Sequence, residues 1–257
     1  MTTRDREDPI LAELVAEVRD DPETLGLLLH GSRALETHRD DSDYDLIRIV
    51  TEEAYLTRRA RDALVEKSLR AGRPKLDVLY QALSRIEPYV RDPGWYTASY
   101  LSARIVFDRT GEVAALIGRL SAEAGRIARE RAPTAYDGYL NSFVRSIKAA
   151  RRGDELGRRL HAAESARELV RLLFGLQSIW PPYHDDLAAH LPQVEAAQGW
   201  PPGFLADALL NLTRDGDPAF QQQLEIRVER LMDANHIAHE WGDDLEPLKA
   251  LRFDVSA

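Results

Sequence analysis

The chain has 257 residues, of which 44% are hydrophobic and 30% charged, and its formal net charge at pH 7 is -9. This composition is typical of a globular protein with one large domain or two modest ones. The chain contains no cysteine, which excludes disulfides, thiolate metal sites and a cysteine nucleophile. The acidic balance argues against nucleic acid as the main partner, because affinity for phosphate backbones comes largely from lysine and arginine, and it fits a small or cationic partner.

No stretch approaches 18 uninterrupted apolar residues, so the sequence predicts no membrane span. The first ten residues are charged and lack the apolar core of a secretory signal. Together with the absence of cysteine, these features lead us to expect a cytoplasmic protein.

The first hundred residues alternate between helical and strand-like patterns. Apolar residues spaced three and four apart predict helices, and short apolar or alternating runs predict strands. The expected elements are a helix over 9–20, strands over 25–30 and 44–50, a helix over 52–71 ended by Gly72 and Pro74, and strands over 75–80 and 103–107.

From Glu112 onward nearly the whole chain has a period of 3.6 residues, which is typical of packed helices. The expected helices cover about 112–131, 134–152, 157–179, 203–213 and 218–241, with breaks at Pro133, Gly153, the Pro181-Pro182 pair and Gly216. The sequence therefore predicts an α+β protein, with an α/β domain and a mixed sheet over 1–110 and a helical bundle over 111–257.

The segment that carries chemistry is Gly31-Ser32, ten further residues, and then Asp43-Tyr44-Asp45. Alternate residues of a strand point the same way, so Asp43 and Asp45 at a strand start aim two carboxylates at one point. This arrangement suits Mg²⁺, which takes one or two carboxylates together with waters and substrate phosphates. Gly31 lets the backbone approach a ligand, and Ser32 adds a hydroxyl and an N–H for a phosphate.

Asp77 lies inside an otherwise apolar strand, where a charge is costly unless it is exposed or bound. Three carboxylates on neighbouring strands are suited to hold one or two metal ions, or one metal ion beside a general base. A lone Asp-x-Asp usually means solvated acids, and a lone Gly-Ser is a turn. Few sequences combine both motifs with an acid inside a third strand such as Asp77, so the combination is a far more specific sign of a catalytic site than either motif alone.

Gly31-Ser32-Arg33-Ala34 followed by Ser42-Asp43-Tyr44-Asp45-Leu46 resembles the signature of the DNA polymerase β-like nucleotidyltransferase superfamily. The match covers roughly residues 25 to 80. The helical second half resembles, more loosely, the aminoglycoside and lincosamide nucleotidyltransferases. One departure is Glu36, which lies where many members have a glycine, so the loop between Ser32 and Asp43 is expected to differ in shape.

The resemblance implies a role for each matching residue. Gly31 and Ser32 grip the triphosphate, Asp43 and Asp45 bind Mg²⁺, and Asp77 is a metal ligand or the general base. It also implies a catalytic domain over 1–110 and a substrate-binding domain over 111–257, with ATP as the co-substrate.

Two positions of the helical half are candidates for the same chemistry. Lys148 lies on one helix face with Asn141 and Arg145, and a basic residue of the helical domain reaches the triphosphate in similar family members; a solvated face is the alternative. Glu164 is a candidate base or acceptor ligand, as a helical-domain glutamate is the base in some relatives. Surface pairing of Glu164 with Arg167 is an adequate structural alternative.

The segment Trp180-Pro-Pro-Tyr183-His184-Asp185-Asp186 is aromatic, rigid and acidic. One interpretation is that it lines an acceptor pocket, with rings stacking on a sugar and acids holding ammonium groups. The other is that it ends a helix and fills a corner of the core.

The leading hypothesis is a magnesium-dependent nucleotidyltransferase that moves a nucleotide, with ATP the expected donor, to a hydroxyl of a small molecule such as an aminoglycoside-like antibiotic. One alternative is a protein-AMPylating enzyme of the antitoxin type, although such proteins resemble only the α/β half. The other is a nucleotide-binding regulatory module without turnover.

Overall fold

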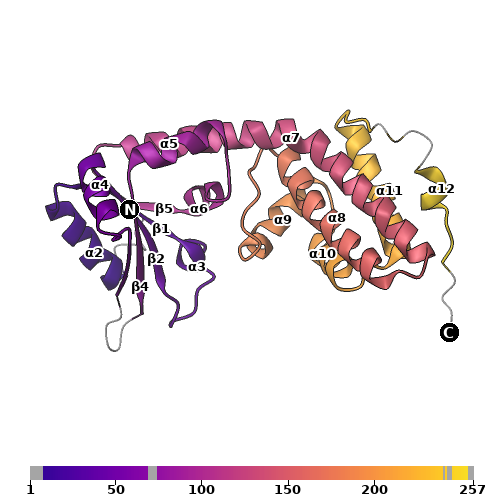
Figure 1. Ribbon diagram of the computed structural model, residues 1–257, viewed down its shortest axis with the longest axis horizontal. Helices are drawn as coiled ribbons and strands as arrows, with labels where there is room; N and C mark the ends of the chain where they lie inside the picture. Colours follow the sequence, from indigo (N-terminus) through magenta and orange to yellow (C-terminus); the bar gives the residue numbers. More distant parts are fainter. Residues whose placement is uncertain (1–7, 69–73, 240, 242–244, 254–257) are drawn as a thin grey trace. The chain divides into compact units, whose positions relative to one another are not determined.

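The computed structural model describes residues 8–68, 74–239, 241 and 245–253 (Figure 1). Contacts within the chain group it into two compact units. The first unit is formed by Met1–Ala124 with Pro182–Asp186, and the second by Gly125–Pro181 with Leu187–Ala257.

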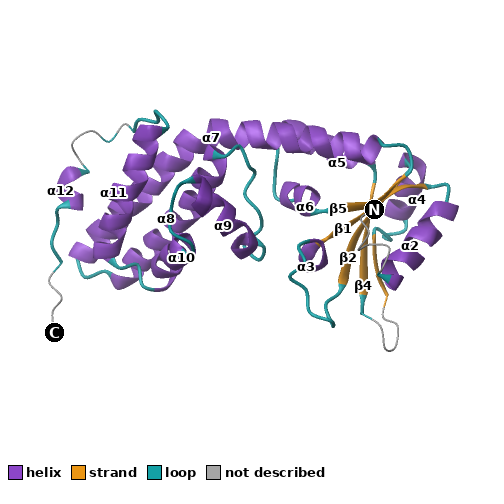
Figure 2. Cartoon of the chain, turned by 180° about the vertical axis from the view of Figure 1, so that it is seen from behind, coloured by secondary structure: helices purple, strands orange, loops and turns teal. Residues whose placement is uncertain are grey.

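The first unit is built on a sheet that has five strands within the described residues, in the order β3-β4-β2-β1-β5 (Figure 2). β2 and β4 run parallel, and the other neighbouring pairs are antiparallel, so the sheet is mixed as predicted. The strands are β1 (Thr24–His30), β2 (Tyr44–Val50), β3 (Val65–Ser68), β4 (Leu76–Gln81) and β5 (Arg104–Asp108). Because β2 and β4 are parallel, their first residues lie at the same edge of the sheet.

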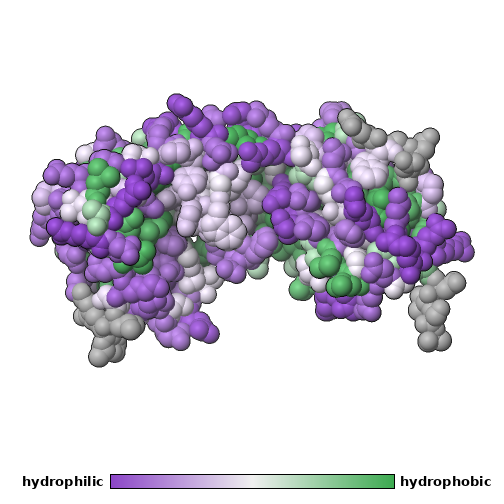
Figure 3. All heavy atoms as spheres, in the orientation of Figure 1, coloured by the Kyte–Doolittle hydropathy of each residue, from purple (hydrophilic) through white to green (hydrophobic). Residues whose placement is uncertain are grey.

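Alternation along β1 supplies two apolar layers, one on each face of the sheet. Leu27 and Leu29 pack in a cluster with the buried residues of α2, whereas Leu28 packs in a cluster with α5, α6 and the start of α7. The helices of this unit are α2 (Pro9–Asp20), α3 (Gly31–Ala34), α4 (Glu52–Ala60), α5 (Leu83–Arg91) and α6 (Thr97–Ser102). On the face drawn in Figure 3, hydrophilic side chains cover most of the surface of each unit.

The helix predicted over 9–20 is confirmed as α2. The carboxylate of Asp8 accepts hydrogen bonds from the backbone N–H groups of Ile10 and Leu11, at 3.0 and 3.1 Å, and Pro9 occupies the first helical position. Such a cap contributes about 1 kcal/mol. Asp8 also accepts a hydrogen bond from the Tyr44 hydroxyl at 2.8 Å, which ties the helix to the start of β2.

The prediction of one helix over 52–71 is wrong beyond Ala60. α4 ends there, β3 follows at Val65–Ser68, and residues 69–71 lie outside the described residues. Asp62 takes a positive φ of 54°, which turns the chain out of the helix. β3 then gains an antiparallel partner in β4, and this pairing outweighs local helix propensity.

The second unit is helical, as predicted, but its helices differ from the expected ones. α7 (Glu112–Arg151) starts in the first unit and continues through Pro133 instead of ending there. A proline inside a helix costs about 3 kcal/mol, and the burial of Ala132 and Tyr136 on either side of Pro133 offsets this cost. The helix predicted over 218–241 ends at Ala234, because His236 takes a positive φ of 56°.

The remaining helices of the second unit pack around one core. They are α8 (Glu155–Leu176), α9 (Leu187–Ala197), α10 (Phe204–Arg214), α11 (Pro218–Ala234) and α12 (Glu246–Lys249). Buried aromatic and aliphatic side chains of α7, α8, α10 and α11 form this core, with Tyr136, Tyr139 and Phe143 among the largest. α5, α6 and α9 were not expected from the sequence.

The sequence placed the domain boundary near residue 110, whereas the contacts divide the chain within α7, after Ala124. Val113, Leu116 and Leu120 of α7 are buried in the core of the first unit, which explains the later division. Of the helices in the described part of the chain, none combines the length and the apolar composition that crossing a membrane requires.

Candidate active site

The predicted acids occupy paired positions in the middle of the sheet. Asp45 stands opposite Asp77 in the parallel pairing of β2 with β4, and His30 stands opposite Asp45 in the antiparallel pairing of β1 with β2. Directly paired residues on neighbouring strands project to the same face. The register therefore places His30, Asp45 and Asp77 in one row, and Asp43 lies just before the first residue of β2.

Gly31 follows β1 directly and lies against the carboxylate of Asp45. Its φ is +69°, and a Cβ added at this position would lie 2.6 Å from Oδ2 of Asp45. Only glycine permits both this backbone conformation and this approach. Ser32 is the second residue of the short helix α3. Its hydroxyl forms no hydrogen bond with the described residues, so it is available to a ligand.

Arg33 anchors the loop that carries the first carboxylate. Its side chain is buried, and the guanidinium donates hydrogen bonds of 2.7 to 3.3 Å to the backbone oxygens of Asp40, Ser42 and Asp43. It also stacks on the Tyr44 ring, 3.9 Å from the ring centroid. The sequence argument gave Arg33 no role, although it stands inside the glycine-serine motif. The loop that follows it includes Glu36 at a positive φ of 60°, a conformation that favours glycine.

Asp45 is the most strongly perturbed acid of the row. Burial raises its pKa above the usual value of 3.8, and the carboxylates of Asp77 and Asp43 act in the same direction. His30 and Lys75 act in the opposite direction. A half-buried carboxylate among like charges is costly in its ionised form, and such an arrangement is frequent at functional sites.

Lys75, immediately before β4, binds two of the predicted metal ligands. Its ammonium Nζ lies 2.6 Å from Oδ2 of Asp77 and 3.2 Å from Oδ2 of Asp43. The hydrogen bond to Asp77 is the main reason that the pKa of Lys75 is raised. The sequence argument missed this residue. The available signal was a lysine two positions before Asp77, on the same side of the strand.

The side-chain oxygens of the predicted Mg²⁺ ligands differ in what they contact. Oδ1 of Asp77 is buried and accepts no hydrogen bond, and Asp45 accepts none from the described residues. These oxygens are the hard ligands that Mg²⁺ prefers. As the side chains lie, however, no three acids or histidines among the described residues converge as a metal site, and Lys75 holds Asp43 and Asp77. The acids therefore offer oxygens of the kind that Mg²⁺ binds, and Asp45 is the one that accepts no hydrogen bond from the described residues, but Asp43 and Asp77 would have to exchange the Lys75 ammonium for the ion.

The segment Pro182–Asp186 belongs to the first unit, although it lies far along the chain. Burial lowers the pKa of His30, while the negative charges of Asp45 and Asp186 oppose the shift. The imidazole of His30 thus interacts electrostatically with acids from β2 and from this segment. That this segment lines an acceptor pocket remains a prediction.

Aromatic rings of this unit gather around Tyr183. The Ser99 hydroxyl donates a hydrogen bond of 3.0 Å to the Tyr183 hydroxyl oxygen. The rings of Trp95 and Tyr183 have centroids 4.9 Å apart and planes at 50°. Trp95 is 76% exposed, so one face of this pair is open to a ligand.

Lys148 and Glu164 both belong to the second unit, on α7 and α8. Lys148 lines a cavity of that unit. Glu164 is exposed and forms an ion pair of 3.2 Å with Arg167, as the surface-pairing alternative expected. Their assignment to the chemistry of Asp43 and Asp45 remains a prediction.

Comparison with known proteins gives a limited result. No protein-family model matches the chain, and no curated protein sequence does so. Among solved structures, the chain is similar to a nucleotidyltransferase-like protein from Exiguobacterium sibiricum 255-15, with 14% sequence identity and a TM-score of 0.41. The similarity covers 93% of this chain and 85% of that chain.

Proposed function

We propose that the first unit transfers a nucleotide from ATP to a hydroxyl group of a small molecule, with Mg²⁺ as cofactor. The observation that carries this proposal is the row of Asp45 and Asp77 at paired positions of parallel strands, with Asp45 packed against Gly31. A triphosphate with a bound metal ion needs carboxylates that hold the ion. It also needs a nearby glycine turn where the backbone can come close to the phosphates.

Gly31 and Ser32 would hold the triphosphate, because the serine hydroxyl has no partner among the described residues and Gly31 keeps the Asp45 carboxylate close to this turn. Asp43 and Asp45 would hold Mg²⁺. When bound, the ion supplies positive charge that stabilises the oxygens around the reacting phosphorus. Arg33 would keep Asp43 in place through its bonds to the loop backbone.

The transfer itself needs a base for the acceptor hydroxyl. Asp77 is the candidate for this role, because its Oδ1 accepts no hydrogen bond from the described residues. The acceptor oxygen forms a bond to the α-phosphorus and its proton passes to Asp77. The bond from the α-phosphorus to the oxygen that bridges to the β-phosphorus breaks, and pyrophosphate leaves.

The acceptor site that we propose for the first unit is the exposed ring pair of Trp95 and Tyr183. Aromatic faces bind the apolar faces of sugars and flat rings, and Asp186 on the same segment adds a negative charge. This combination suits a polyhydroxylated molecule with amino groups, such as an aminoglycoside.

A second function is nucleotide binding without turnover. The ammonium of Lys75 favours it, because it bonds two of the three acids that catalysis needs, at 2.6 and 3.2 Å. In this case Mg·ATP binds but releases no pyrophosphate with any acceptor.

The experiment is a pyrophosphate-release assay with each nucleoside triphosphate, Mg²⁺ and a panel of hydroxylated acceptors. Transfer is expected with at least one acceptor, and Asp43→Asn and Asp45→Asn are expected to abolish it. The matched control is Asp41→Asn, an exposed acid of the same loop that pairs with Arg39. Near-normal activity of either active-site variant at saturating Mg²⁺ would overturn the proposed function.

A further inference from the structure

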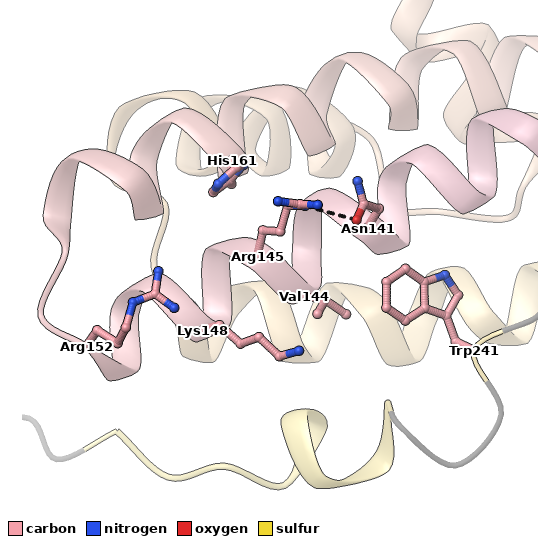
Figure 4. Close-up of a pocket in the computed structure, with 7 residues that line it drawn as sticks. All are labelled: Asn141, Val144, Arg145, Lys148, Arg152, His161 and Trp241. Carbon is pink, nitrogen blue, oxygen red and sulfur yellow. Dashed lines mark hydrogen bonds between the residues drawn. The ribbon is translucent and has the colours of Figure 1, made fainter.

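The second unit contains a cavity of about 340 Å³ between α7, α8 and Trp241 (Figure 4). Its volume lies in the range of small-molecule sites. All of its lining residues belong to this one unit. The polar lining consists of Asn141, Arg145, Lys148, Arg152 and His161.

The cavity is lined on one side by positive charge. Arg145, Lys148 and Arg152 are spaced three and four apart, so they follow one face of α7 and its end. Among the described residues that line the cavity, none is acidic. The chain as a whole has a net charge of -9, so this local cluster of positive charge is opposite in sign to the net charge.

Several other basic residues of the same helices are paired with acids. Elsewhere on α7 and α8, Arg126 pairs with Glu130, and Arg159, Arg167 and Arg171 each pair with a glutamate three or four residues away.

Within the described part of the chain, by contrast, Lys148 has no ion pair, and Arg145 bonds only the neutral Asn141, at 3.1 Å. Arg152 has its nearest carboxylate, that of Asp154, at 4.0 Å. Like charges at this spacing repel one another, and an anion in the cavity relieves that repulsion.

The cavity also has an apolar end. Figure 4 shows the indole of Trp241 and the side chain of Val144 toward one end of the cavity, and Arg152 and His161 toward the other. Trp241 is only partly buried, and its side chain lines the cavity. A ligand that fits both ends carries an anionic group and a flat ring.

We propose that this cavity binds a small organic phosphate with an attached ring. The phosphate lies among Arg145, Lys148 and Arg152, whose guanidinium and ammonium groups donate charge-assisted hydrogen bonds. The ring lies against Trp241. The lining of this site comes from the second unit alone, and its binding needs no divalent metal. A polycation such as an aminoglycoside is repelled here, so the site has a different ligand class from the acceptor proposed above.

The test is isothermal titration of the full chain with phenyl phosphate in the presence of EDTA. Inorganic phosphate probes the anion alone, and benzyl alcohol probes the ring alone. Phenyl phosphate is expected to bind most tightly, inorganic phosphate more weakly, and benzyl alcohol not at all. Trp241→Ala is expected to reduce the affinity for phenyl phosphate to that for inorganic phosphate.

Arg145→Gln and Lys148→Met are each expected to weaken phenyl phosphate binding about tenfold, the usual loss for a charged hydrogen bond. The matched control is Arg151→Gln, a neighbouring arginine of α7 that does not line the cavity. Circular dichroism confirms that each variant is folded. No binding by the wild type, or an equal loss in Arg151→Gln, overturns the proposal.

Asp45→Asn separates this site from the nucleotide site, because it is expected to leave phenyl phosphate binding unchanged. If Asp45→Asn removes that binding, the anion binds at the first unit and the proposal is wrong, whatever the outcome for nucleotide transfer. If nucleotide transfer fails for every acceptor but the anion binds as described, only the proposed function is lost.

Discussion

Gly31 offers a sharp test of the site geometry. Its φ of +69° is in the left-handed region, and an added Cβ would lie 2.6 Å from Oδ2 of Asp45. Gly31→Ala therefore has two effects. It forces a residue with a side chain into an unfavourable backbone conformation, and it pushes the Asp45 carboxylate from its place.

The two effects are separated by Gly111→Ala in the same unit. Gly111 has a φ of +82°, and a Cβ added there would meet nothing within 4 Å. The backbone cost is about 1–2 kcal/mol for either variant. The clash at Gly31 adds little to this, because the carboxylate is the end of a flexible side chain that can rotate. What it changes is the position of Asp45, and displaced ligand geometry costs roughly 10–100-fold in metal affinity.

Stability is measured by hydrogen exchange of peptides that cover β1 and β2, which reports on the first unit alone. Metal affinity is measured by titration with Mn²⁺. Both variants are expected to lose similar stability, and only Gly31→Ala is expected to lose Mn²⁺ affinity. Equal Mn²⁺ affinity in Gly31→Ala and Gly111→Ala would refute the inference that Asp45 needs the space above Gly31.

Three further outcomes are expected. Asp45→Asn should stabilise the first unit at pH 7, because the raised pKa of Asp45 means that its ionised form destabilises the folded state. Hydrogen exchange at several pH values should show that this gain in stability shrinks as the pH falls. No gain at pH 7 would contradict the prediction. Lys75→Met should tighten Mn²⁺ binding about tenfold, because it removes the ammonium that bonds Asp43 and Asp77. Unchanged or weaker binding in calorimetry would show that the ammonium and the metal ion do not compete for these carboxylates. Burial raises the pKa of Glu225 to about 8, so the native second unit binds a proton that the unfolded chain has released, and its stability should fall as pH rises from about 4.5 to about 8. Glu225→Gln should flatten this dependence in urea unfolding, and a slope equal to that of the wild type would show that Glu225 does not cause it.

Much of the first unit follows from local sequence pattern. The apolar run from Leu25 to His30 and the β-branched, partly alternating stretch from Tyr44 predicted β1 and β2, and the structure has both. The spacing of Asp43 and Asp45 predicted acids at a strand start, and the register of β2 with β4 adds Asp77 at a paired position. The two strands and the spacing of Asp43 and Asp45 depend on residues near one another in sequence, which is why they were accessible, whereas the pairing of Asp45 with Asp77 is visible only in the register of the strands.

Features that depend on distant partners were not accessible. β3 exists because β4 pairs with it, and no local pattern in Val65–Ser68 indicates that partner. α7 passes Pro133 because the side chains on either side of it are buried against other helices. Tyr183 joins the first unit through Ser99 and Trp95, which precede it by more than eighty residues.

Contacts between charged side chains that are distant in sequence were likewise not predictable from local pattern. The contact of Lys75 with Asp43 requires the strand pairing, whereas its contact with Asp77 is local and was indicated by their spacing of two residues. The stripe of Arg145 and Lys148 was visible as a helix face, but the cavity that it lines needs Trp241, far along the chain. Periodicity predicts that a face is polar; it does not tell what lies opposite that face.

The central claim is that Asp45 and its neighbours bind a metal-bound nucleoside triphosphate. The most direct measurement is the equilibrium binding of α,β-methylene ATP, with and without Mg²⁺, to the wild type, Asp45→Asn and the control Asp41→Asn. We expect binding that depends on Mg²⁺, is lost in Asp45→Asn and is unchanged in Asp41→Asn. Binding that ignores Mg²⁺, or that is the same in Asp45→Asn as in the wild type, would contradict the account.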